Sequence, residues 1–267
     1  AAISAVLCPV LVHVVGWGLV GSAIANVVAQ VISASMFIRA IVAEGAPLRP
    51  SVTKMRAQVK LGRDLMLRSV AFQACFISAT TVAAHTSTAA VGAHQVVLQL
   101  WNFLAMVLDS LAIAAQALVG EALGASEADR ARSVAWQVTR YGLVFGIVLG
   151  VVFALLAGVL PHVFTSDTAV LAEVPKAWWF FVALQPVCGV VFALDGVMFG
   201  AGDAAFMRNA TLLAAFGGFL PLVWAARVFD WGLVGIWAGL SAFLVVRLVA
   251  AITRTRSGRW AVVGAVR

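Results

Sequence analysis

Charged residues are scarce in this chain. Asp, Glu, Lys and Arg make up 11 % of its 267 residues, whereas a typical soluble domain carries roughly 25 %. Hydrophobic residues reach 63 %, and the mean hydropathy is +1.03. This balance excludes an ordinary soluble domain and predicts an all-α polytopic membrane protein.

Cysteines are few, and enzyme motifs are missing. Cys8, Cys75 and Cys188 each lie in an apolar run without C-x-x-C spacing, so we expect no metal or redox centre. The sequence contains no H-E-x-x-H, G-x-x-x-x-G-K-[ST] or G-x-S-x-G motif and no cluster of Asp residues for Mg²⁺ and a diphosphate. We therefore expect no enzyme, no cofactor and no metal, and an energy source other than ATP. A membrane-embedded enzyme is the alternative that these absences disfavour.

Long apolar runs are what the sequence has in abundance. A helix needs about 20 apolar residues to cross a bilayer. By this criterion we predict a partial span at residues 1–14 and seven full spans, at 17–41, 64–84, 91–120, 134–163, 177–201, 209–228 and 232–253.

The basic residues lie mainly on one side of these predicted spans. Sixteen of the 18 Lys and Arg residues fall on that side, and only Lys176 and Arg227 on the other. The positive-inside rule assigns the richer side, with the C-terminus, to the cytoplasm. Because the charges are dispersed over loops and form no basic face interleaved with exposed aromatics, we expect no nucleic-acid partner.

A five-residue sequence occurs twice. Trp-Gly-Leu-Val-Gly stands at 17–21 and again at 231–235, and each copy leads into a long apolar run. The copies are separated by an even number of predicted spans, so both run through the bilayer in the same direction, as in transporters built from parallel repeats. The 214-residue displacement leaves only 53 residues for the first lobe. We therefore expect the rear part of a longer, two-lobed protein.

The only long polar stretch, 44–63, contains Pro47 and Pro50 and ends in a basic amphipathic segment. A short helix on the cytoplasmic face fits this pattern, either as the linker between lobes or as an ordinary cytoplasmic loop. The predicted organisation is thus the end of a first lobe at 1–43, the linker at 44–63, a six-helix second lobe at 64–253 and a cytoplasmic tail at 254–267.

Glycine and proline mark positions where helices are expected to approach closely or bend. Gly142, Gly146 and Gly150 follow small-xxx-small spacing, which lets neighbouring backbones approach each other. Pro186, and Pro221 after two glycines, loosen their helices. A kink beside a cavity and a static bend remain equal alternatives for both prolines.

A polar stripe runs along the predicted span 91–120. Gln95, Asn102, Asp109 and Gln116 recur every seven residues, which places them on one helix face. Because such a stripe is costly in lipid, it must face other helices or water. For the amides taken singly, hydrogen bonds to neighbouring helices are the favoured interpretation.

Two carboxylates stand out because they lie inside predicted spans, Asp109 and Asp195. An ionisable group there is a functional candidate. Asp109 could exchange protons, or Ser110 and nearby amides could hold it as a packing group. The predicted cation-binding cavity comprises Asp109, Asp195, Gln95, Asn102, Gln116, Gln73 and Gln185. Asp64 and Arg68, four residues apart, predict a structural salt bridge.

Three segments of the chain form a recognisable set: Ala93-His94-Gln95, the run from Asp109 to Ala125, and Asp195-Gly196 leading to Gly200-Ala201-Gly202-Asp203. They resemble the second-lobe signatures of the multidrug and toxic compound extrusion (MATE) transporters, in the branch named for DNA-damage-inducible protein F. The resemblance implies a MATE-like bundle of two parallel six-helix lobes, located in a bacterial plasma membrane. It also implies efflux of cationic or amphipathic compounds by alternating access, driven by inward proton or sodium movement, with the bilayer but no obligate protein as partner.

Two departures from the family pattern refine this expectation. Met198-Phe199 precedes Gly200 where the family often has an Arg, and Glu121 replaces a Gln. Residues 70–84 contain Gln73 but no carboxylate, whereas some sodium-coupled branches have an acid there, so we favour protons over Na⁺.

Two alternatives to drug efflux remain open. A lipid-linked precursor flippase of related fold would need basic residues facing the cavity, and only Arg68, Arg140 and Arg247 come near. An inactive truncated fragment is the other alternative.

Overall fold

The computed structural model describes residues 2–14, 16–43 and 52–263, and all of its regular structure is helical. The chain divides into two compact units, Ala1–Met55 and Arg56–Arg267. Within the described residues, seven helices are long and apolar enough to cross a membrane, in agreement with the sequence prediction. They are Gly18–Ala40, Gln58–Thr86, Thr88–Gly124, Ala128–Leu155, Thr168–Gly200, Ala204–Val228 and Gly232–Ser257.

The first unit is a helical hairpin. Helix α1 (Ala2–Pro9) continues into a π-helical turn at Val10–Val14, and α2 (Gly18–Ala43) follows. The repeated pentapeptide begins α2 here and α10 (Gly232–Ser257) in the second unit. Its first glycine has a positive φ in both copies, +50° at Gly18 and +56° at Gly232. The repeat therefore encodes the same left-handed start to a helix, which glycine adopts without strain.

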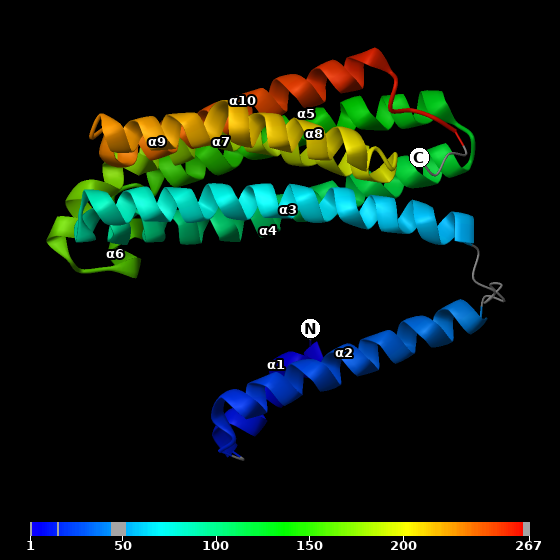
Figure 1. Ribbon diagram of the computed structural model, residues 1–267, viewed down its shortest axis with the longest axis horizontal. Helices are drawn as coiled ribbons and strands as arrows, with labels where there is room; N and C mark the ends of the chain where they lie inside the picture. Colours follow the sequence, from blue (N-terminus) through cyan, green and yellow to red (C-terminus); the bar gives the residue numbers. More distant parts are fainter. Residues whose placement is uncertain (1, 15, 44–51, 264–267) are drawn as a thin grey trace. The chain divides into compact units, whose positions relative to one another are not determined.

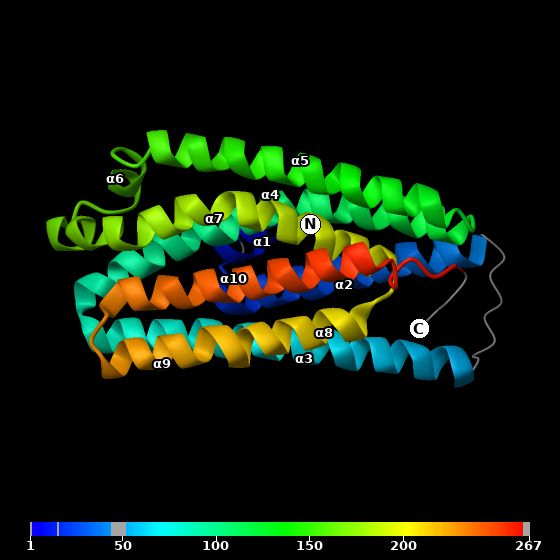
Figure 2. The same ribbon diagram turned by 90° about the horizontal axis from the view of Figure 1, so that it is seen from above.

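The second unit is an antiparallel helical bundle (Figures 1 and 2). Its other helices are α3 (Val52–Thr86), α4 (Thr88–Gly124), α5 (Ala128–Leu155), α6 (Leu160–Phe164), α7 (Thr168–Gly200), α8 (Ala204–Ala214) and α9 (Leu220–Val228). The N-terminal end of α3, the α4–α5 and α7–α8 turns and the C-terminal end of α10 lie at the right-hand end in both views. The short α6 and the α9–α10 turn lie at the opposite end.

Helix α7 is the most deeply buried of the seven, because 61 % of its apolar 18-residue stretch is buried. Close backbone contacts at glycines join it to α5. A Cβ atom on Gly142 of α5 would collide with the carbonyl oxygen of Gly189 of α7. One on Gly146 would collide with the carbonyl oxygen of Gln185. The small-xxx-small prediction is therefore confirmed.

The same kind of contact joins α7 to α4. A Cβ atom on Gly196 would collide with the carbonyl oxygen of Ala112, and one on Gly200 would lie 2.5 Å from that of Gln116. We refer to Gly142, Gly146, Gly189, Gly196 and Gly200 together as the glycine seam. It fixes the spacing of α4, α5 and α7.

Several helix ends differ from the sequence prediction. Helix α5 stops at Leu155, not at 163, because the chain turns at residues 156–159, which include Gly158, and Pro161 then opens α6. Helix α7 begins at Thr168, nine residues before the predicted start, because the Asp167 carboxylate accepts a hydrogen bond from the Ala169 amide at 2.8 Å.

The predicted linker is only partly described. Residues 44–51, like 264–267, lie outside the described residues. Residues 52–63 are helical, but they are the first turns of α3 and not a separate surface helix.

The two prolines behave differently. Pro186 lies within the uninterrupted helix α7. Ahead of Pro221 the chain forms a π-helical turn, Ala215–Phe219, between α8 and α9, because proline cannot donate a backbone hydrogen bond and crowds the preceding turn. Phe219, the last residue of that turn, reaches the cavity described next.

Candidate functional site

The second unit contains a cavity of about 310 Å³ between α3, α4, α7 and α10. Its polar lining comprises Arg68 of α3, Asn102 and Asp109 of α4, Asp195 of α7 and Arg247 of α10. The rest of the wall is apolar, and most of it is aromatic, with Phe72, Phe76, Trp101, Phe192, Phe199, Phe219 and Phe243. Such a composition, with few polar groups on apolar walls, is typical of a small-molecule site.

Asp195 is bound by two arginines. Arg68 donates from Nη2 to the Oδ2 atom of Asp195 at 2.7 Å, and Arg247 donates from Nη2 to the same oxygen. The side chains of Arg68, Arg247 and Asp195 are only 18 %, 6 % and 15 % exposed. The sequence predicted Asp195 as a cavity residue and placed Arg68 and Arg247 near the cavity, but it did not predict that both arginines pair with Asp195. The cavity is therefore not lined by acids alone.

Aromatic rings hold both guanidinium groups in place. The Arg68 Cζ atom lies 5.3 Å from the ring centre of Phe72 and 5.1 Å from that of Phe199. The Arg247 Cζ atom lies 5.3 Å from the same Phe72 ring and 5.7 Å from that of Phe243. Phe72 therefore contacts both cations, and these cation–π contacts orient the guanidinium groups independently of Asp195.

Asp109 differs from Asp195 in having no partner. Its side chain is exposed and lines the cavity. The described residues give it no hydrogen bond or ion pair, although Asp195 and Arg68 are its electrostatic neighbours. Ser110, a candidate partner, instead donates its hydroxyl to the Val107 carbonyl at 2.6 Å. Asp109 is thus a carboxylate available to a ligand.

The amide side chains of the predicted stripe divide into two groups. Asn102 lines the cavity together with Asp109. Gln95 and Gln116 are exposed but do not line it. The stripe is one helix face, as predicted, but the cavity covers only the middle of it.

The remaining predicted amides lie elsewhere. Gln73 is exposed beside a shallow hollow formed with Phe76 and Thr80. Gln185 is 1 % exposed, and its Nε2 donates to the Phe181 carbonyl at 3.0 Å. The structure therefore brings Asp109, Asp195 and Asn102 to one cavity, and Gln73 and Gln185 to other surroundings.

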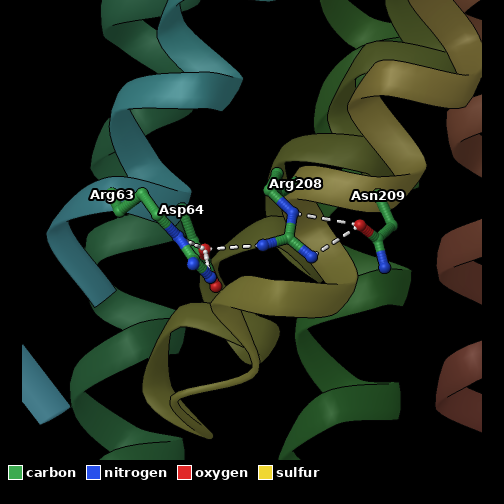
Figure 3. A network of polar contacts seen from close by, with 4 residues as sticks. All are labelled: Arg63, Asp64, Arg208 and Asn209. Carbon is green, nitrogen blue, oxygen red and sulfur yellow. Dashed lines mark hydrogen bonds and ion pairs between the residues drawn. The ribbon is translucent and has the colours of Figure 1, made fainter. Parts of the chain in front are cut away.

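The predicted salt bridge between Asp64 and Arg68 is wrong. Figure 3 shows that Asp64 turns toward Arg208 of α8, whose Nη1 donates to Oδ1 of Asp64 at 2.6 Å, while Arg63 donates to the same atom at 2.9 Å. Arg208 also donates to Asn209. Arg68 lies one turn further along α3 and points to Asp195. The sequence could not reveal a partner 144 residues away.

Arg247, one of the three basic residues that the sequence placed near the cavity, lines it. It lies within the apolar run from Phe243 to Val249. An arginine inside a span is itself a signal of a functional or paired group. Arg140, the third candidate for a basic cavity, is exposed and does not line it.

Comparison with known proteins identifies the class of this molecule. The family model described as MatE matches residues 65–224. The chain therefore belongs to the MATE family, whose members are transporters and not enzymes. It is a multi-pass membrane protein, as its fold and its relatives indicate.

Relatives and solved structures extend this match. The chain is 34 % identical to Protein DETOXIFICATION 44, chloroplastic, of Arabidopsis thaliana, over 97 % of the chain and 50 % of that protein. It is 31 % identical to DNA damage-inducible protein F of Escherichia coli (strain K12), over 77 % of the chain and 45 % of that protein. The crystal structure of the Vibrio cholerae MATE transporter VcmN in the bent form matches 98 % of the chain and 61 % of its own, at 19 % identity and a TM-score of 0.82. The chain spans about half the length of the curated relatives it matches.

Proposed function

We propose that the complete protein is a secondary active exporter of amphipathic solutes that carry a cationic group, working by alternating access. The observation that supports this most directly is Asp109, a carboxylate without a partner among the described residues, in a largely aromatic cavity. A carboxylate attracts the cation, and aromatic faces accept both the cation and the apolar body of the solute.

The proposed coupling ion is the proton. A hard metal cation is held by several oxygen ligands, and the cavity offers the oxygens of Asp109 and Asn102, while Oδ2 of Asp195 is already bound by two guanidinium groups. A proton needs only one carboxylate, so Asp109 can release the solute when it is protonated. One proton crossing about 100 mV supplies about 2.3 kcal/mol, or somewhat under two orders of magnitude in solute concentration.

We also propose a bacterial plasma membrane location with the C-terminus in the cytoplasm. Support comes from the end of the bundle that carries Arg56, Lys60 and Arg254, which is much richer in cations than the end near Lys176 and Arg227. The relatives include bacterial and chloroplast proteins. In a variant in which Cys8, Cys75 and Cys188 are replaced by Ser, a cysteine introduced at Ser257 should react with a membrane-impermeant maleimide only in inverted vesicles. Labelling of intact cells would contradict this orientation.

The transport proposal is tested by ethidium efflux from cells that express the complete reading frame. Efflux should stop when a proton uncoupler is added. Asp109→Asn should lower efflux at least tenfold at unchanged membrane abundance. Glu121→Gln is the matched control, because Glu121 is an exposed acid on the same helix outside the cavity. Unchanged efflux by Asp109→Asn would refute the role of Asp109.

A lipid-linked precursor flippase is the second candidate, and Arg68 and Arg247 are the observation in its favour. A diphosphate needs cations that are free to bind it, whereas both of these are already engaged by Asp195. A competition experiment distinguishes the two functions. A polyprenyl diphosphate should inhibit ethidium efflux only if the cavity accepts it.

A further inference from the structure

We propose that the cavity selects zwitterionic solutes, with an aromatic body, a cationic group at Asp109 and a carboxylate at Arg68 and Arg247. This inference rests on the proposed transport function and names its substrate class. It follows from the uneven distribution of charge inside one cavity.

The cluster around Asp195 carries an excess positive charge. Two guanidinium groups share a single carboxylate oxygen, and all three side chains are largely withdrawn from solvent. Asp109 of the same cavity attracts Arg68 but makes no hydrogen bond to it, so an anion that bonds directly to the two arginines would stabilise them further. This part of the cavity is therefore suited to an anionic group of the ligand.

The two arginines also have hydrogen-bond donors to spare. A guanidinium group has five N–H donors, and the described residues accept only one hydrogen bond from Arg68 and one from Arg247. The Nε atom of Arg68 is buried and has no partner among the described residues. A planar carboxylate matches the planar fork of donors that arginine presents. The unpaired donor is thus an independent indication of a missing acceptor.

The aromatic rings keep these donors in position for a ligand. Phe72 contacts both guanidinium groups, and Phe199 and Phe243 contact one each. Because the rings, and not Asp195 alone, position the arginines, a ligand carboxylate can bind beside Asp195 without first ordering them. The flat walls beyond them accept an aromatic body.

The other charge of the cavity has the opposite sign and lies on another helix. Asp109 on α4 has no hydrogen bond or ion pair within the described chain. A purely cationic solute would be attracted by Asp109 but repelled by the arginines, and a purely anionic solute would experience the reverse. A zwitterion compensates both charges at once, so it should bind more tightly than either.

Two dyes with the same ring system test this selection. Rhodamine 110 carries a cationic xanthene and a carboxylate, and rhodamine 123 is its methyl ester, which keeps the cation and loses the anion. Binding to the complete protein, purified in detergent, is followed by fluorescence anisotropy. We expect rhodamine 110 to bind about tenfold more tightly, as a charge-assisted hydrogen bond implies.

Variants separate the two charged parts of the cavity. Arg247→Gln should reduce the preference for rhodamine 110 to about twofold or less, and Arg247→Lys should give an intermediate value. Asp109→Asn should weaken both dyes by similar factors and leave their ratio unchanged. Arg254→Gln is the control for loss of a charge, because Arg254 pairs with Asp203 and does not line the cavity.

The outcomes that overturn the proposal are specific. Equal affinity for the two dyes, no binding of either, or a preference that survives in Arg247→Gln would each reject it. If the dye preference holds but ethidium efflux is insensitive to the uncoupler, the proposed transport function fails while the zwitterion site stands.

Discussion

The two sides of α7 are built in opposite ways. On one side the glycine seam brings the α7 backbone against α4 and α5 so closely that a single Cβ atom would collide with a carbonyl oxygen. On the other side, Arg68 of α3 and Arg247 of α10 meet at Asp195. Helix α10 also packs on α7, where Ala251 contacts Val190 and Leu194. The first side is held by backbone contacts, whereas the second combines apolar side-chain packing with an ion-pair cluster that lines a cavity.

This difference indicates how one helix can be both rigid and functional. Backbone packing leaves no room for adjustment, so the seam fixes Asp195 of α7 and Asp109 of α4 relative to each other. Side chains of arginine can change rotamer, and ion pairs can exchange partners. The cavity side is therefore the one that can admit a ligand.

The largest effect should follow from breaking the seam. Gly189→Leu places a branched side chain against Gly142 and Gly146, whose backbone atoms cannot rotate away. We expect a loss of more than about 3 kcal/mol, seen as loss of the monodisperse peak in detergent. Gly62→Ala is the control, because nothing lies within 4 Å of its Cβ position. Equal behaviour of the two variants would show that the seam does not hold the bundle.

The next effect should come from an ion pair outside the cavity, between α3 and α8. Asp64 is 2 % exposed and links α3 to α8 through Arg208 (Figure 3). Asp64→Asn leaves Arg208 without its carboxylate and should cost about 2 kcal/mol. This is less than for a fully buried pair, because the Arg208 side chain is 19 % exposed. Arg63→Gln, which removes the 58 % exposed partner, should shift the thermal midpoint much less. A larger shift for Arg63→Gln than for Asp64→Asn would show that Arg63, and not Arg208, is the stabilising partner of Asp64.

A smaller effect is expected from the aromatic wall. Phe72→Leu keeps an apolar side chain but removes the ring that contacts Arg68 and Arg247. It also removes the edge-to-face contact with Phe243, whose ring centre lies 5.4 Å from that of Phe72. The cost should be about 1 kcal/mol in thermal unfolding. The preference for rhodamine 110 should fall with it, because the guanidinium groups are less well positioned. A retained preference would show that Asp195 alone orients them.

The sequence predicted the spans from hydropathy, and it predicted the close contacts of Gly142 and Gly146 from their small-xxx-small spacing. It did not predict their counterparts on α7, Gly189, Gly196 and Gly200. It was less accurate at helix ends. The apolar run predicted a start of this span at 177, whereas α7 begins at Thr168, directly after its Asp167 cap. Helix ends depend on local hydrogen bonds that average hydropathy does not record.

The site was only partly predictable for a different reason. A seven-residue period showed that Asn102 and Asp109 share a face, but not how far along that face the cavity extends. The i, i+4 rule paired Asp64 with Arg68 because both lie on one helix. Tertiary packing instead gave each a partner on another helix, Arg208 and Asp195. Long-range pairing of charges requires the fold.

The smallest effect on stability should come from replacing Asp109, the residue with the largest proposed effect on transport. Asp109 has no hydrogen bond or ion pair among the described residues and is exposed, so Asp109→Asn should change the free energy of unfolding by less than about 0.5 kcal/mol. Asp195→Asn, by contrast, leaves two guanidinium groups without their shared carboxylate and should lower the thermal midpoint. A destabilised Asp109→Asn protein would mean that this carboxylate holds the bundle together. Its availability to a ligand, on which the cation-binding role depends, would then be lost.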